Sequence, residues 1–277
     1  MRKLGITARI LSLLAACGIG FAAQAQSLPV SVDVSGNVAS IRIGSGEHSV
    51  ADVTLTFDEA RGLSAGSLGV SASLVDVNDA LLLARLPAGV AVPSAFPLLI
   101  TIQPPALGGL NFDRTVGVEV HTHALPYTAG SRLRLFKAPL DGDFRDITRS
   151  IAPGSVRATG TTGGFSQFLV LADTRGTAAV IADKFVRLRA VADLLPAAQQ
   201  APVDDYIDTS EDALAAGDHA GAVAALELLR AHVAQQAGTT ISETWLASGG
   251  SSNIAGGLLA GASSLQYSIG YQRDFGN

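Results

Sequence analysis

Residues 168–196 have the sequence FLVLADTRGTAAVIADKFVRLRAVADLLP, and the hydrophobic period changes inside this stretch. Up to Asp173 the apolar residues form a short run of the kind found in strands. Beyond it they recur at spacings of three and four residues, which predicts an amphipathic helix. The helical positions are Ile181, Phe185, Leu188, Val191 and Leu195, and Pro196 ends the pattern. The change predicts a domain boundary near residues 174–177.

On the N-terminal side of this boundary, period-two alternation dominates from Leu28 to Asp173. In the first run Val30, Val32 and Val34 alternate with polar residues. Short alternating runs separated by Gly, Pro, Asn and Asp predict an antiparallel β-sandwich whose strands each have one apolar face. Later strands are expected at Leu98–Ile102, Val116–Thr122, Arg132–Phe136, Ser155–Gly160 and Phe168–Leu171.

On the C-terminal side, helical spacing continues to the end of the chain. Further apolar stripes cover residues 203–214 and 223–233, and a glycine-rich one covers residues 254–265. Residues 240–245, which include Trp245, are expected to begin a short helical turn. Short connections favour antiparallel neighbours in a small bundle. The predicted fold class is mainly β plus α, with a β-sandwich over residues 26–173 and an independent helical domain over residues 174–277.

Residues 1–25 are predicted to be a secretory signal peptide. Its parts are the cationic Arg2, Lys3 and Arg9, the apolar segment 10–22 and the cleavage site Ala23-Gln24-Ala25 before Gln26. The protein is therefore expected to be periplasmic, secreted or on the cell surface. Leu14-Ala15-Ala16-Cys17 also fits a lipobox, so a lipoprotein anchored through Cys17 is the alternative. Cys17 is the only cysteine, so no disulfide or cysteine nucleophile is expected in the mature chain.

The composition limits the possible functions. Hydrophobic residues make up 48% of the chain and charged residues 16%, which excludes a disordered chain. The net charge of −5 disfavours binding to nucleic acid and to anionic lipid. No transmembrane span is expected after removal of the signal peptide. The sequence has no phosphate-binding loop or dinucleotide fingerprint, and no cofactor is predicted.

The end of the strand region resembles immunoglobulin-like sandwich modules of bacterial exported proteins. The matching stretches are LRLF at 133–136, GDFRDIT at 142–148 and GTTGGFSQF at 160–168. In such modules a strand leads into a G-x-F-x-D-I/V-T turn, and a last hairpin carries F-S-x-F. The resemblance implies that Phe144, Ile147, Phe165 and Phe168 are core residues.

The helical region resembles FIMAH-type modules, which occur near the ends of secreted bacterial proteins. The matching stretches are SEDALAAGDHAGAVAAL at 210–226, LLRAHVAQQAG at 228–238 and IS at 241–242. A lone tetratricopeptide-like hairpin is the alternative, although no second copy follows at the expected period. The FIMAH resemblance implies an accessory or interaction module without a catalytic role.

One motif raises the possibility of a serine hydrolase. Gly62-Leu63-Ser64-Ala65-Gly66 matches the G-x-S-x-G pattern. A nucleophile elbow needs a strand before the serine and a helix after it, whereas residues 68–74 alternate like a strand. A turn between strands is favoured, and a hydrolase using Ser64 is the alternative.

A second alternative is a metal-dependent site. Glu119, His121 and His123 are spaced by two residues, which places them on one face of a strand. Three such groups can bind zinc or another transition metal. A solvated polar strand face is the favoured interpretation.

A third alternative is a calcium-stabilised adhesion module, because calcium prefers oxygen-rich loops. Two loops qualify, one with Asp141, Asp143 and Asp146 and the other with Asp76, Asn78 and Asp79. Neither follows the EF-hand pattern, so solvated turn carboxylates are favoured.

The sequence thus predicts a bacterial envelope or secreted protein of interaction or structural type, with no catalytic activity. Its expected partner is an unknown protein or another envelope component.

Overall fold

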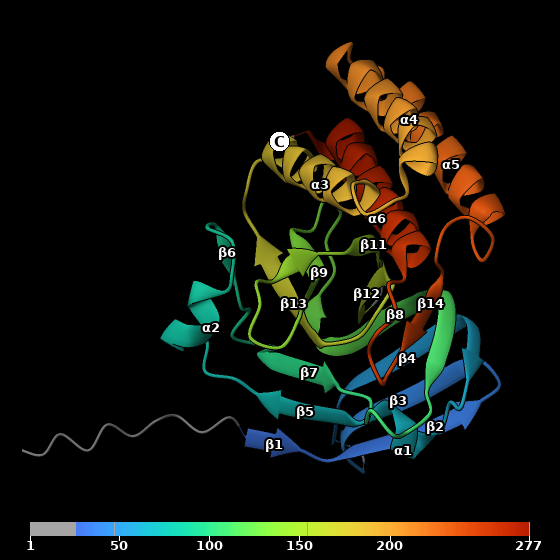
Figure 1. Ribbon diagram of the computed structural model, residues 1–277. Helices are drawn as coiled ribbons and strands as arrows, with labels where there is room; N and C mark the ends of the chain where they lie inside the picture. Colours follow the sequence, from blue (N-terminus) through green and yellow to red (C-terminus); the bar gives the residue numbers. More distant parts are fainter. Residues whose placement is uncertain (1–25, 47, 154, 277) are drawn as a thin grey trace, which may run out of the picture.

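The computed structural model describes residues 26–46, 48–153 and 155–276. The predicted signal peptide, the lipobox and Cys17 therefore lie outside the described residues. Two antiparallel sheets are followed by the long helices α3 to α6 (Figure 1). This arrangement confirms the predicted mixed β plus α fold class.

The first sheet has the strand order β1-β5-β7-β13-β9-β10, with β6 also paired to β13. Its strands are β1 (Gln26–Leu28), β5 (Val70–Leu74), β6 (Val90–Ala91), β7 (Leu98–Ile102), β9 (Leu133–Ala138), β10 (Arg145–Asp146) and β13 (Gln167–Asp173).

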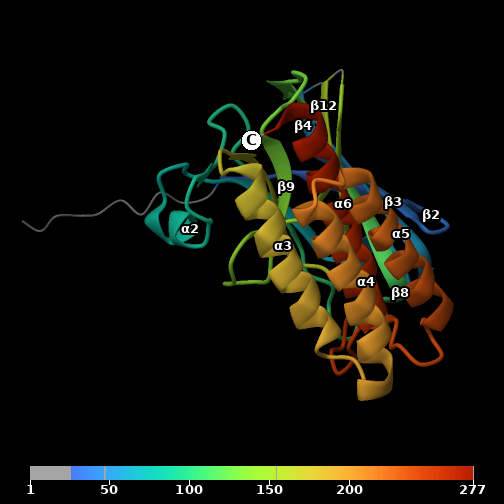
Figure 2. The ribbon, with the colours of Figure 1, turned by 90° about the horizontal axis from the view of Figure 1, so that it is seen from above.

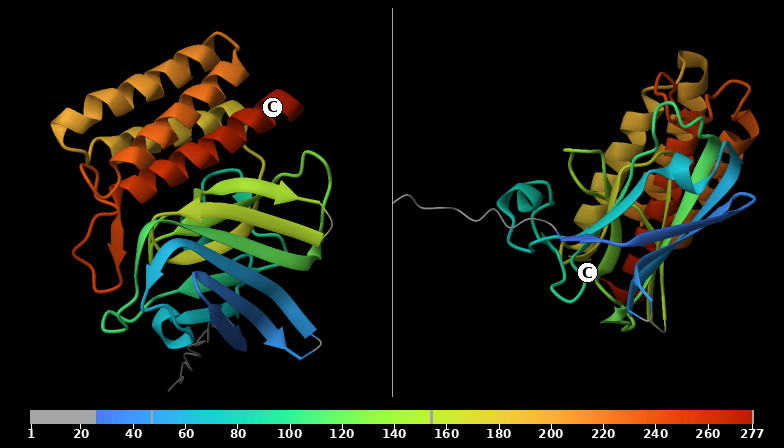
Figure 3. Two further views of the ribbon diagram at one scale, coloured as in Figure 1. Left: turned by 90° about the vertical axis from the view of Figure 1, so that its right-hand side faces the viewer. Right: turned by 90° about the horizontal axis from the view of Figure 1, so that it is seen from below.

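The second sheet has the order β11-β12-β8-β4-β3-β2, with β14 also paired to β8. Its strands are β2 (Val30–Ser35), β3 (Val38–Ser45), β4 (His48–Arg61), β8 (Asn111–Pro126), β11 (Thr148–Ala152), β12 (Ser155–Thr162) and β14 (Thr244–Leu246). Figure 3 shows the helices α3 to α6 together on one side of the two sheets.

The main core lies between the sheets, where alternate side chains of each strand point inward. Ile41 and Leu55 of the second sheet and Ile100 and Phe168 of the first are almost fully buried in it. A smaller core lies on the opposite face of the first sheet, under the helix α2 (Ala80–Ala84). Phe144 belongs to this smaller core. The first sheet is therefore covered on both faces.

The strand β14 crosses the predicted domain boundary. Residues 240–245 do not begin a helical turn as expected, because Thr244–Leu246 pair with Asn111–Asp113 of β8. β8 extends beyond the end of β12 there, which leaves its backbone free to bind β14. Trp245 stacks on Phe112 with ring centroids 5.2 Å apart. The independence of the two domains stays a prediction, but the C-terminal region supplies one strand and one core side chain to the sandwich.

The helices are α3 (Thr177–Ala192), α4 (Ala197–Ala215), α5 (His219–Gln236) and α6 (Ile254–Phe275). Figures 2 and 3 show α6 between the sheets and the α4–α5 pair, with α3 beside it. In the part of the chain that the structure describes, no helix is both long and apolar enough to cross a bilayer.

Glycines allow α6 to pack closely against α3. A Cβ atom at Gly257 would lie 3.1 Å from Val191 Cγ1, and one at Gly261 would lie 3.1 Å from Leu188 Cδ1. The GxxxG pattern of residues 257–261 therefore serves close packing inside the bundle. The glycine-rich segment is a continuous helix because burial on nearly all sides compensates for its low helix propensity.

Polar contacts at both ends of α6 hold it on the sandwich. At its start, Asn253 Nδ2 donates to the carbonyl oxygens of Arg114 at 2.6 Å and of Gly163 at 3.0 Å. Near its end, Tyr271 Oη donates to the carbonyl oxygen of Gly130 at 2.8 Å. The guanidinium of Arg134 lies 4.3 Å from the centre of the Tyr271 ring. These contacts fix the gap between α6 and the sheets.

Candidate ligand-binding cavity

A cavity of about 430 Å³ lies where the sheets meet α3 and α6. This volume is in the range of small-molecule sites. Its wall is built from the β9–β10 region, the β12–β13 hairpin, α3, β14 and the first half of α6. The charged and aromatic side chains in this wall are Lys137, Arg145, Asp146, Phe165, Lys184, Arg187 and Trp245.

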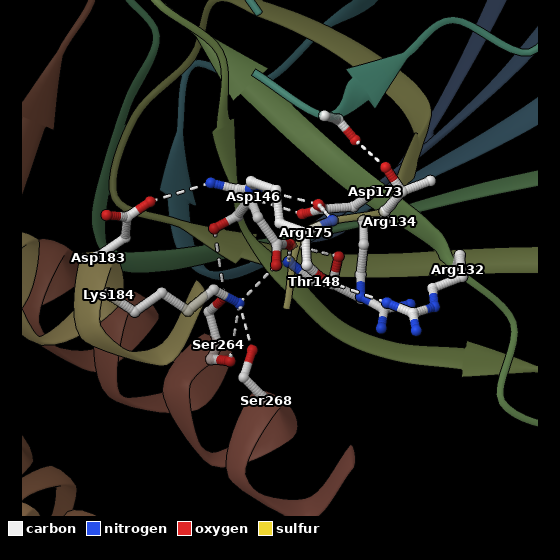
Figure 4. Close-up of polar contacts among 12 residues, drawn as sticks. Arg132, Arg134, Asp146, Thr148, Asp173, Arg175, Asp183, Lys184, Ser264 and Ser268 are labelled. Carbon is white, nitrogen blue, oxygen red and sulfur yellow. Dashed lines mark hydrogen bonds and ion pairs between the residues drawn. The ribbon is translucent and has the colours of Figure 1, made fainter. Parts of the chain in front are cut away.

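A buried ion pair forms one wall of the cavity. Lys184 Nζ of α3 lies 2.7 Å from Asp146 Oδ2 of β10, and both side chains are at most 3% exposed. Nζ also donates to Ser264 Oγ at 2.7 Å and to Ser268 Oγ at 2.8 Å (Figure 4). The other oxygen of Asp146 accepts from the backbone and side chain of Thr148. The pair therefore links the first sheet to α3 and α6.

Protonation in this pair follows from burial and charge. Burial acts to raise the pKa of Asp146, but the charge of Lys184 and the hydrogen bonds from Lys184 and Thr148 hold it below its usual range. Burial lowers the pKa of Lys184 to about 8, against the opposing attraction of Asp146. Both groups are therefore charged at neutral pH and compensate each other.

Lys137 has a different environment. Its Nζ donates to Thr162 Oγ1 at 2.7 Å, and it forms no ion pair within the described chain. Burial lowers the pKa of Lys137 to about 8, and the nearby charge of Arg145 adds to the shift. Lys137 is thus an amine at the cavity whose hydrogen-bond partner among the described residues is an uncharged hydroxyl.

Two arginines bring further positive charge to the cavity, the exposed Arg145 and the partly buried Arg187. Neither Arg145 nor Arg187 forms an ion pair or a side-chain hydrogen bond with any residue that the structure describes. Nη2 of Arg187 is buried without a hydrogen-bond partner. Burial lowers the pKa of Arg187, although a guanidinium stays charged at neutral pH. The wall therefore carries four cations and one carboxylate, in a chain whose net charge is −5.

The absence of a side chain at Gly164 allows the Trp245 indole to lie close to the backbone beside Lys137. A Cβ atom at Gly164 would lie 3.0 Å from Trp245 Nε1 and 3.9 Å from Lys137 Nζ. Trp245 is held by its stacking on Phe112 and by an edge contact with Phe165. It is the only tryptophan of the chain. The indole and the amine thus border the same space from two sides.

The structure places Ser64 away from this cavity. Ser64 follows the long strand β4 and caps the helix α1 (Ala65–Leu68), so a short helix precedes the strand expected after it. Its Oγ accepts from the backbone of Ser67 at 3.1 Å, and the Ser67 hydroxyl accepts from the Ser64 backbone. A structural role as a helix cap accounts for these contacts.

The three residues of the alternative metal site, Glu119, His121 and His123, do not converge on one point. Glu119 pairs with Arg157 at 3.1 Å, whereas His121 Nε2 lies 2.5 Å from Ser155 Oγ. The ring of His123 lies 4.8 Å from that of His121. Burial lowers the pKa of His121, and the charges of Arg157 and His123 add to the shift. Neither here nor elsewhere in residues 26–46, 48–153 and 155–276 do three His, Cys, Asp or Glu side chains gather as a metal site would require.

The carboxylates of the two acidic loops also point to different partners. Asp141 and Asp143 are exposed, whereas Asp146 turns inward to Lys184. In the other loop, Asp76 accepts from the Asn78 backbone at 2.9 Å and Asp79 caps α2. Carboxylate oxygens in these loops therefore serve a turn, a cap and a buried ion pair.

The cavity residues were not predicted from the sequence, although one feature of the composition points to them. The chain has 16 arginines and three lysines, and one lysine is Lys3. The other two, Lys137 and Lys184, both line the cavity. Lysine is ordinarily a common surface residue. Among the described residues, lysine therefore occurs only in the wall of this cavity.

The structure is a β-sandwich covered by a helical layer, with a cavity lined by four cationic side chains and one carboxylate between the two. The chain belongs to the family described as "Family of unknown function (DUF6689)", whose model matches residues 13–273. No curated protein and no solved structure matches the chain.

Proposed function

We propose that the protein is an exported bacterial binding protein without catalytic turnover, and that its cavity holds a small organic carboxylate. The observation that carries this proposal is that Lys137, Arg145 and Arg187 line an open space and form no ion pair with the residues that the structure describes. Burying a charge is costly unless an opposite charge accompanies it. A carboxylate ligand would supply an opposite charge to the buried amine of Lys137 and to the partly buried Arg187, whereas Arg145 is exposed and already solvated.

The wall also favours an apolar part in the ligand. Phe165, Leu188 and Val191 line the cavity together with Trp245. Ligand sites commonly combine an apolar wall with a few polar groups that fix orientation. A ring or short chain that carries one carboxylate matches this combination.

The proposal extends to compartment and partner. Export rests on the predicted signal peptide, and the cavity is compatible with a carrier or receptor role in the envelope. We also propose that the sheets correspond to an immunoglobulin-like module and the helices to a FIMAH-type module, on the strength of the quoted sequence stretches. Such modules would hold the protein against another envelope component.

Export is tested by the mass of the protein recovered from the medium or the periplasm. The expected mature chain begins at Gln26, because Ala23 and Ala25 occupy the small-residue positions of the cleavage site. A diacylated Cys17 at the N-terminus would instead identify a lipoprotein.

Binding is tested by titrating the purified chain with benzoate and following the fluorescence of Trp245. Benzyl alcohol, with the same ring and no charge, is the matched ligand. Benzoate is expected to bind about tenfold or more tightly, because a charge-assisted hydrogen bond contributes roughly 1.5–3 kcal/mol. Equal responses to the two ligands would contradict a site for anions.

The charge of Lys137 gives this test a pH dependence. Below the pKa of about 8 the amine is protonated and attracts the carboxylate, so benzoate affinity is expected to fall as the pH rises through that value. Lys137→Met should weaken benzoate binding and reduce this pH dependence, and the part that remains would belong to Lys184, whose pKa is also about 8. Arg42→Met, which removes an exposed cation on β3, is the control and should leave binding unchanged.

A further inference from the structure

We propose that Lys137 is a nucleophilic amine that condenses reversibly with the carbonyl group of its ligand, so that the ligand class is an oxo-carboxylate. This inference rests on the proposed function, because it assumes that the cavity admits a carboxylate. The ligand would form a covalent bond to Nζ of Lys137, and it would carry both a carbonyl group and a carboxylate.

The hydrogen-bond geometry singles out Lys137 over Lys184. Nζ of Lys184 is committed to Asp146, Ser264 and Ser268, and its side chain is 3% exposed. Nζ of Lys137 has Thr162 Oγ1 as its partner. Thr162 Oγ1 in turn donates to the carbonyl oxygen of Gly164 at 2.9 Å, so it accepts from the amine. The remaining positions on the Lys137 nitrogen are free to meet a ligand in the cavity.

The surroundings also favour the neutral amine that such a reaction needs. Lysine becomes nucleophilic when it is desolvated or placed beside another cation, because both effects disfavour the ammonium form. Lys137 has both features, since burial and Arg145 together bring its pKa to about 8. At neutral pH a minor but substantial fraction of the amine is therefore unprotonated.

The cations beside Lys137 would bind the carboxylate of the ligand, while Lys137 reacts with its carbonyl group. Arg145 and Arg187 line the same cavity and have no carboxylate partner among the residues described. A carboxylate held there would place a neighbouring carbonyl carbon within the space that borders Nζ and Trp245. Gly164 lines the same space, and a Cβ atom there would lie 3.9 Å from Lys137 Nζ. The arrangement favours a carbonyl compound that carries a carboxylate over one that does not.

The proposed step is an addition followed by loss of water, with no oxidation or reduction. The lone pair of neutral Nζ forms a C–N bond to the carbonyl carbon as the C=O π bond breaks. A proton moves from nitrogen to oxygen, which gives a carbinolamine. The hydroxyl group then leaves with a second proton as water, and an imine remains. Hydrolysis by the reverse route releases the ligand and the amine.

The test uses the full chain, glyoxylate as the probe and cyanoborohydride to reduce any imine to a stable secondary amine. Peptide mass analysis locates the adduct. We expect it on Lys137 and not on Lys184, and we expect the rate to rise between pH 7 and pH 9 as the amine loses its proton. Labelling is expressed relative to the α-amino group of the same chain, which corrects for the intrinsic reactivity of the aldehyde.

Propanal is the matched probe because it has an aldehyde and no carboxylate. Its relative labelling of Lys137 is expected to be roughly tenfold lower, the effect of one lost charge-assisted contact. Equal relative labelling by the two aldehydes would overturn the inference. Labelling of Lys184 to the same extent as Lys137 would overturn it as well.

A variant separates this inference from the proposed function. Lys137→Arg keeps the positive charge and removes the nucleophile, so it should lose the adduct while still binding benzoate. Wild-type protein that binds benzoate but gives no adduct at Lys137 would overturn the covalent step and leave the binding function intact. Absence of benzoate binding would overturn the proposed function, whatever the labelling pattern.

Discussion

Replacing Asp146 with alanine is expected to lower the free energy of unfolding by about 3–5 kcal/mol, because the Lys184 ammonium would remain buried without its counter-charge. Both side chains of the pair are at most 3% exposed. Ser264 and Ser268 would still accept from Nζ, but a neutral hydroxyl supplies no opposite charge. Urea unfolding followed by tryptophan fluorescence measures the loss.

Two further variants show whether burial is the cause. Asp208→Ala breaks the ion pair with Arg189, which is also 2.7 Å long but exposed, and should cost less than about 1 kcal/mol. Combining Asp146→Leu with Lys184→Met should recover most of the stability, because apolar groups can replace both buried charges. If Asp146→Ala costs no more than Asp208→Ala, the buried pair does not stabilise the contact between the first sheet and α3.

Gly256→Ala is expected to destabilise the protein by about 1–3 kcal/mol, as overpacking of a close contact does. A Cβ atom at this position would lie 2.1 Å from the carbonyl oxygen of Arg114, and backbone atoms cannot move aside as a flexible side chain can. The first turn of α6 would have to shift away from β8. Thermal unfolding measures the loss, and the affinity for benzoate should fall with it because α6 lines the cavity.

Gly270→Ala is the matched substitution in the same helix. A Cβ atom there meets no atom within 4 Å, so only helix propensity changes. This variant should be more stable than the wild type by up to about 1 kcal/mol. Opposite signs for the two substitutions support close backbone approach at Gly256, whereas a gain in both would contradict it.

Local periodicity was sufficient to predict most of the elements. The strand expected at Leu98–Ile102 coincides with β7, a short apolar run in which Leu98, Ile100 and Ile102 are buried in the main core. Trp245 was placed wrongly because its strand depends on a partner far away in the sequence. Residues 240–245 show no period of their own, and the unpaired end of β8 determines their conformation. Such pairing is not visible in a local pattern.

The candidate site could not be predicted for a related reason. Its charged side chains come from β9, β10 and α3, and no spacing within one segment connects them. Asp146 was grouped with Asp141 and Asp143 because they are close in sequence, but its partner Lys184 lies in a helix of the other region. The scarcity of lysine was the one feature of the sequence that pointed to this site. It is a property of the composition, so it does not show which segments come together.

The residues of the cavity wall lie between Lys137 and Ser264 in the sequence. The site is therefore complete only when most of the chain has been synthesised. Chains emerge from the ribosome at about 5–20 residues per second, N-terminal parts first. The strands of both sheets apart from β14 are therefore made before the ligand site exists. During that interval Lys137 and Arg145 have no helical layer over them. A ligand that binds the folded state stabilises it by mass action, so it would act on nascent chains only after α6 has emerged.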